Sequence, residues 1–86
     1  MYNYQTERSK IFTEEGQRIF LAVRDRANEL IVQAGAVSMQ HATTVGSGDS
    51  WFLMACVDRL VELKELREIT GPNTAGQDRV FVWGPK

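Results

Sequence analysis

Residues 38–69 read SMQHATTVGSGDSWFLMACVDRLVELKELREI, and residues 70–86 continue as TGPNTAGQDRVFVWGPK. This stretch decides the fold, because four patterns follow one another in it: a short helix, a glycine turn, an amphipathic helix and a hairpin. Ser38 can cap the short helix, and Gly46-Ser47-Gly48 predicts the turn that ends it. Residues 36–41 remain ambiguous, since Val37, Met39 and His41 also alternate as in a short strand. We favour the helix.

The second helix of this stretch begins after the turn, where Asp49 or Ser50 can serve as its N-cap. Its apolar residues recur at helical spacing and predict a buried stripe of Leu53, Cys56, Val57, Leu60 and Leu63. Further on, residues 66–69 and 79–83 flank a cluster of Gly, Pro and Asn, which is typical of a hairpin. Two helices joined by a short glycine turn indicate a helix-turn-helix.

The chain upstream of Ser38 predicts one long helix preceded by an N-terminal arm. Thr13 followed by Glu14 and Glu15 is an N-cap with acids in the first helical turn, and Gly35 suits a helix C-terminus. Residues 1–12 are polar and carry no helical periodicity, so we expect a loose, frayed arm. Tyr2 and Tyr4 alternate within it, which would also suit an added strand or a partner contact. Residues 13–86 then form a single domain.

The pattern from Ser38 to Trp83 resembles the winged helix-turn-helix family of regulators. The resemblance is carried by Ser38, Ala42, the Val45-Gly46 pair, Leu53, Val57 and the run from Leu60 to Leu66. It implies an α+β fold of three helices plus a C-terminal β-hairpin, with residues 49–63 as the recognition helix in a DNA major groove and residues 71–78 as the wing. Lys64 departs from the family, which usually has glycine there for the sharp exit from the helix, although a non-glycine residue can take a left-handed backbone at modest cost.

Two sets of residues are candidates for binding. The resemblance to a DNA-binding family implies duplex DNA as partner, bound by a homodimer. The residues selected for this contact are Ser50, Arg59, Lys64, Arg67 and Arg79. The alternative is a protein-interaction module, a small inhibitor or adaptor that binds a basic protein surface. It would use four of the outward positions of the recognition helix, namely Trp51, Met54, Asp58 and Glu62. Acidic residues at these positions oppose contact with phosphates.

We expect a non-enzymatic protein. The chain of 86 residues has a net charge of -1, so no global positive field draws it to nucleic acid or to an anionic membrane. Cys56 is the single cysteine and His41 the single histidine, which leaves no Cys/His metal set and no convincing nucleophile. We therefore expect no metal, no cofactor and no catalytic residue. The chain also lacks a stretch long and apolar enough to span a membrane, and we expect a cytoplasmic protein.

Overall fold

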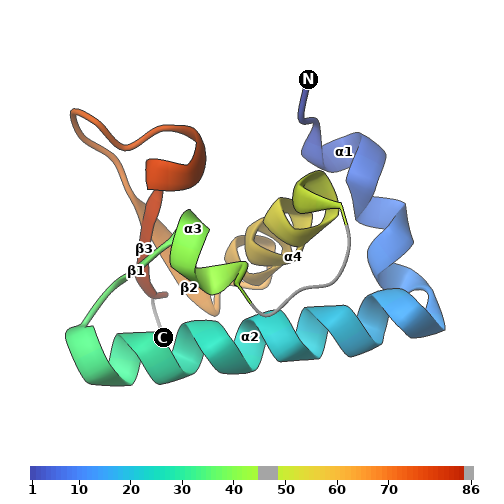
Figure 1. Cartoon of the computed structure of the whole chain (residues 1–86), viewed down its shortest axis with the longest axis horizontal. Coiled ribbons are helices and arrows are strands. Elements are labelled where there is room, and N and C mark those ends of the chain that lie inside the picture. The colour runs from blue at the N-terminus through green and yellow to red at the C-terminus, as the bar shows by residue number, and fades with distance from the viewer. Residues whose placement is uncertain (45–48, 85–86) are drawn as a thin grey trace.

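The computed structural model describes residues 1–44 and 49–84, in which helices pack on one another and on a small antiparallel sheet (Figure 1). The long helix α2 runs along one side, and α4 lies across it between the sheet and the N-terminal helices. In chain order the elements are α1 (Tyr4–Glu7), the 3-10 helix η1 (Arg8–Phe12), α2 (Glu14–Ala34), β1 (Val37–Ser38), α3 (Met39–Ala42), α4 (Ser50–Glu62), β2 (Leu66–Ile69), the 3-10 helix η2 (Gly76–Asp78) and β3 (Val80–Trp83).

Helix α2 has the caps that the sequence predicts. The Thr13 side chain accepts a hydrogen bond from the backbone N–H of Gly16, and Gly35 ends the helix in the left-handed region with φ 83°. The apolar face of α2 is buried against the core through Phe20, Val23, Ala27 and Ile31. The prediction of a long helix from Thr13 to Gly35 is confirmed.

The N-terminal segment is not a loose arm, and that prediction is wrong. Asn3 caps α1 by accepting from the backbone N–H of Thr6, η1 follows directly, and Ile11 is 0% exposed. Both helices pack against α4, and η1 also packs against α2. Helical periodicity is weak here because the two helices are short. The segment is ordered by what it contacts rather than by its own propensity.

The ambiguity at residues 36–41 arises because this segment is strand first and helix second. Val37 and Ser38 form β1, which pairs with β3, and Ser38 then caps α3 by accepting from the backbone N–H of His41. The predicted N-cap at Ser38 is confirmed. The turn expected at Gly46-Ser47-Gly48 lies outside the described residues.

Helix α4 is more deeply buried than its predicted stripe. Asp49 is its N-cap and accepts from the backbone N–H of Trp51. Leu53, Cys56, Val57 and Leu60 are buried as expected. Two positions are corrected: Met54, expected to point outward, is 8% exposed, whereas Leu63 lies at the C-cap beyond the last helical turn and is exposed.

The predicted hairpin is part of a three-stranded sheet with the strand order β1-β3-β2. Strand β2 pairs with β3 antiparallel in a register that places Leu66 opposite Trp83, and β1 adds a short third strand on the other edge of β3. Lys64 takes a left-handed backbone at the exit of α4, with φ 64°. The class is therefore α+β as predicted, with four α-helices in the described residues instead of three.

Candidate functional site

The outward face of α4 is the first place to look for a binding site, because both candidate sets drew residues from this helix. Met54, Asp58 and Glu62 follow one another at a spacing of four and therefore share one face. This face is covered by residues 2–12, which we call the strap and which comprise α1, η1 and the two residues before them. Met54, on the same face, is also buried.

Three strap side chains bind the two carboxylates of that face. The Tyr2 hydroxyl donates to Oδ2 of Asp58 at 2.5 Å, and the Tyr4 hydroxyl donates to Oε1 of Glu62 at 2.7 Å. Arg8 Nε donates to both oxygens of Glu62, at 2.9 and 3.1 Å. Each carboxylate that was expected to face a partner thus already binds a residue more than fifty positions away in the same chain.

The electrostatics of Glu62 follow from these contacts. Hydrogen bonds from Tyr4, Arg59 and Arg8 lower the pKa of Glu62 to about 2. Burial, followed by the hydrogen bond to Glu62, raises the pKa of Tyr4 to about 12. The guanidinium groups of Arg8 and Arg59 both lie 5.0 Å from the centre of the Phe12 ring, a distance at which a cation is attracted to a ring face.

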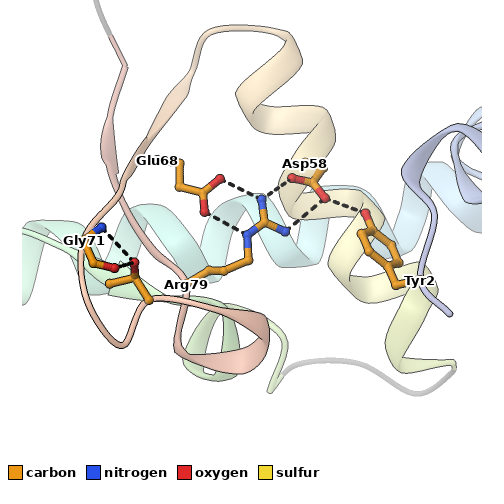
Figure 2. A network of polar contacts seen from close by, with 6 residues as sticks. Tyr2, Asp58, Glu68, Gly71 and Arg79 are labelled. Atoms are coloured by element: carbon orange, nitrogen blue, oxygen red, sulfur yellow. Dashed lines mark hydrogen bonds and ion pairs between the residues drawn. The ribbon is translucent and has the colours of Figure 1, made fainter.

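A second cluster joins the strap to the base of the hairpin through Asp58 (Figure 2). Arg79, one residue before β3, donates from Nη2 to Oδ1 of Asp58 at 2.7 Å and to Oε1 of Glu68 at 2.8 Å, and from Nε to Oε2 of Glu68 at 2.9 Å. Tyr2 donates to the other oxygen of Asp58. These side chains are largely buried, with 18% of Arg79, 15% of Asp58 and 27% of Glu68 exposed. The two carboxylates raise the pKa of Arg79, chiefly through the hydrogen bond to Glu68.

Figure 2 also includes the hairpin loop, which is closed by Gly71 and Thr74. The Thr74 hydroxyl donates to the carbonyl of Gly71 at 2.6 Å and accepts from its backbone N–H at 3.0 Å. At the far end of the loop, Arg79 is fixed by α4 and β2. The loop is therefore positioned by the same side chain that neutralises Asp58.

The residues selected for duplex DNA are not brought together. Ser50 is exposed at the start of α4, whereas Lys64 and Arg67 are exposed beyond its other end, about 20 Å away for a helix of thirteen residues. Arg59 is paired with Glu62 at 2.7 Å, and Arg79 is occupied as described. Two of the four predicted cations therefore offer no free charge to phosphate.

The residues selected for a protein partner are mostly occupied within the chain. Asp58 and Glu62 bind the strap, Met54 is buried, and Trp51 alone remains available, with 41% of its surface exposed. Beside it is a groove of about 250 Å³ between the starts of α2 and α4 and the end of the strap. The groove is lined by Lys10, Thr13, Glu15, Gly16, Ile19, Asp49 and Phe52. Its apolar floor and charged rim suit an amphipathic side chain.

Chemically reactive groups are few in this part of the chain. Burial raises the pKa of the Cys56 thiol to about 12, which keeps it protonated and unreactive at neutral pH. His41 is exposed and hydrogen-bonded through Nδ1 to Ser38 Oγ at 2.7 Å. In residues 1–44 and 49–84, no three His, Cys, Asp or Glu side chains are grouped so as to hold a metal ion. No helix in those ranges is long and apolar enough to cross a membrane.

Comparisons with known proteins add no relative. Neither protein-family models, nor curated proteins, nor solved structures match this chain. The function has to be argued from the contacts just described.

The sequence prediction missed the strap side chains, although one signal could have found them. Tyr4, Arg8 and Ile11 are spaced by four and three residues, which places them along one face of a helical segment. Because residues 1–12 were predicted to form a frayed terminus, this helical spacing was not used. The alternation of Tyr2 and Tyr4 was read as suited to a partner contact, and the partner is α4 of the same chain.

Proposed function

We propose that this protein is a non-enzymatic protein-interaction module, a small adaptor or inhibitor, and that the outer face of α4 is its binding surface. One observation carries the proposal: the carboxylates of Asp58 and Glu62 bind a polypeptide segment, the strap, through Tyr2, Tyr4 and Arg8. A surface that binds tyrosine hydroxyls and a guanidinium has the chemistry for a basic protein surface. We place the protein in the cytoplasm, because its one cysteine is a buried, free thiol.

The framework we propose for this module is a winged helix. In support, α2, β1, α3, α4, β2 and β3 follow in the order of that fold, and β1 pairs with β3 beside the β2–β3 hairpin that would be the wing. The left-handed Lys64 gives the sharp exit from α4 for which the family usually has glycine. Folds of this kind can carry different functions, so the fold alone does not select between partners.

Electrostatics favour a polypeptide over nucleic acid at α4. A DNA phosphate approaching this face would meet Asp58 and Glu62, and the cations beside them, Arg59 and Arg79, are already paired with these carboxylates. Apart from the strap, three carboxylates, Asp58, Glu62 and Glu68, share these two guanidinium groups, so the cluster keeps a net negative charge that opposes a phosphate. A protein helix with its own Arg and Tyr residues meets no such opposition.

Photo-cross-linking tests the proposal. A photoreactive phenylalanine replaces Trp51 in one variant and Gln33, an exposed position near the end of α2, in the control variant. Both are expressed in the cells that normally make the protein. We expect a discrete protein adduct from position 51 that is absent from position 33. Identical adduct patterns from the two positions, or adducts to nucleic acid alone, would contradict the proposal.

Duplex DNA remains the second candidate, favoured by one observation at the hairpin. Arg67 is exposed on β2 and, within the described ranges, has no carboxylate at ion-pair distance; Lys64, also exposed, lies just before the strand. If the hairpin makes the main contact with DNA, these two cations would bind the phosphates. The resemblance to the winged helix-turn-helix family implies that a homodimer makes this contact. Anisotropy of labelled random duplex at low salt tests it, with Arg67→Ala as the variant. Binding that weakens steeply with salt and depends on Arg67 would support DNA.

A further inference from the structure

The strap consists of helices that cannot persist without a surface to dock on. Helix α1 has four residues and η1 has five, whereas isolated helices shorter than about 12 residues are marginal in water. Its helical form therefore depends on α4 and on the start of α2. A segment of this kind is either docked or unfolded, which gives the contact two alternative states.

The docked strap has one largely buried polar anchor, the bond from Tyr2 to Asp58, and a second one that is open to water. In the Arg8–Glu62 pair, 35% and 36% of the two side chains are exposed, and ion pairs at such sites contribute about 1 kcal/mol or less. Ile11 is the fully buried apolar anchor. The exposed pair adds specificity but little strength, so the docked strap is held mainly by Ile11 and by the bond from Tyr2 to Asp58. A short terminal segment of this kind can open locally without unfolding of the whole domain.

The start of α2 stays capped when the strap leaves. The Thr13 side chain caps α2 through the N–H of Gly16, and this bond lies within α2 and its own N-cap. Undocking would break the Thr13 hydroxyl bond to the Lys10 carbonyl at 2.9 Å and the Gln17 bond to the Ile11 carbonyl at 2.7 Å. Thr13 is therefore the natural pivot, because the chain direction changes there from η1 to α2.

Undocking would uncover the face of α4 that carries Asp58 and Glu62, together with the apolar surface against which Ile11 is buried. The exposed face would then combine an apolar site with two carboxylates, which is complementary to a helix that carries an aliphatic residue together with Tyr and Arg. We infer that the strap is an intramolecular competitor, and that the outer face of α4 binds an external helical segment bearing tyrosine, arginine and an aliphatic anchor. This inference rests on the proposed function and names the class of partner.

A peptide competition experiment tests the inference on the full chain. The probe is a fluorescent peptide of residues 1–13, MYNYQTERSKIFT, and binding is followed by anisotropy. If the strap competes, Arg8→Ala in the protein weakens the competitor, and the peptide binds about threefold more tightly than to the unchanged protein. Arg8→Ala in the peptide weakens binding by about the same factor. Together the two changes cancel, because strap and peptide again make the same contacts.

Matched controls keep this result specific. Arg18→Ala removes an exposed arginine whose ion pair, with Glu15, lies within α2, and it should leave peptide affinity unchanged. If Arg8→Ala prevents folding, as circular dichroism would reveal, Tyr4→Phe in protein and peptide replaces it with the same expected cancellation. The inference is overturned if the Arg8→Ala protein binds the peptide no more tightly than the unchanged protein, or not at all at about 1 mM.

Two further outcomes separate the inference from the proposed function. A concentration-dependent dimer of the Arg8→Ala protein, with straps exchanged between copies, would overturn the external partner in favour of a second copy of this chain. Failure of the peptide to bind, combined with a specific adduct at position 51, would overturn the inference and leave the proposed function standing. Failure of both would remove the proposed function as well.

Discussion

The hydroxyl of Tyr2 lies 2.5 Å from Oδ2 of Asp58, although 56 positions separate the two residues in the chain. The other oxygen of Asp58 accepts from Arg79, which in turn binds Glu68. One carboxylate on α4 therefore connects the N-terminal strap with the base of the hairpin. Changes at Asp58 should be felt at both places.

Asp58→Asn should destabilise the protein by about 1–3 kcal/mol, because Arg79 would keep only one of its two carboxylates in a largely buried position. The substitution preserves the size of the side chain, so lost charge is the main change. The measurement is the free energy of unfolding from urea denaturation. Glu15→Gln, which removes one member of an exposed ion pair, is the control and should change it by less than about 0.5 kcal/mol. Equal effects of the two substitutions would contradict the network as described.

Gly16→Ala should destabilise the docked strap, although alanine is normally the better helix former. A Cβ at Gly16 would lie 2.0 Å from the carbonyl oxygen of Lys10 and 2.9 Å from Cα of Ile11, so the backbone of η1 must move. We expect a loss of about 1–3 kcal/mol and faster amide hydrogen exchange in residues 4–12. Gly71→Ala is the control, since nothing lies within 4 Å of its added Cβ. A stabilised Gly16→Ala protein would show that the strap tolerates displacement at this point.

Local signals in the sequence predicted the elements that have strong caps. Thr13, Gly35 and Ser38 act through backbone geometry and neighbouring hydrogen bonds, which short-range patterns encode. The three-stranded sheet was predicted only as a hairpin, because β1 has two residues and gains its identity from pairing with Phe81 and Val80. A strand of that length carries too little alternation to be recognised on its own.

The candidate site was harder to predict, for a reason visible at Met54 and Glu62. Helical spacing correctly places these residues on one face of α4, but spacing cannot say what covers that face. The cover comes from the other end of the chain and is held by contacts of Tyr4 and Arg8 with Glu62. A separate pairing, with Asp58 and Glu68, occupies Arg79, which we selected from the sequence as a cation for DNA.

Lys64→Gly should stabilise the protein by about 1 kcal/mol, because Lys64 has φ 64° and only glycine adopts this conformation without steric cost. The side chain is exposed, so few contacts are lost. Thermal or urea unfolding measures the gain. Asn73→Gly is the matched control at φ 66° and should gain less, since asparagine tolerates the left-handed region. A larger gain at Asn73 than at Lys64 would contradict this account.

Strap docking should be insensitive to pH near neutrality and weaken at both extremes. The pKa of Glu62 is lowered from 4.5 to about 2, so its contribution is complete above pH 4.5 and is lost as the pH falls toward 2. The pKa of Tyr4 is raised from 10.0 to about 12, so its contribution is complete below pH 10 and is lost as the pH rises through 12.

The free energies of unfolding of the unchanged protein, Glu62→Gln and Tyr4→Phe, each measured against pH, test this prediction. The difference between the unchanged protein and Glu62→Gln should be constant from neutral pH down to about 4.5 and then shrink, because below that value the unfolded chain binds the proton first. The difference for Tyr4→Phe should shrink only on the alkaline side. A Glu62→Gln difference that begins to fall above pH 6 would mean that Glu62 is not held by Tyr4, Arg8 and Arg59 in solution.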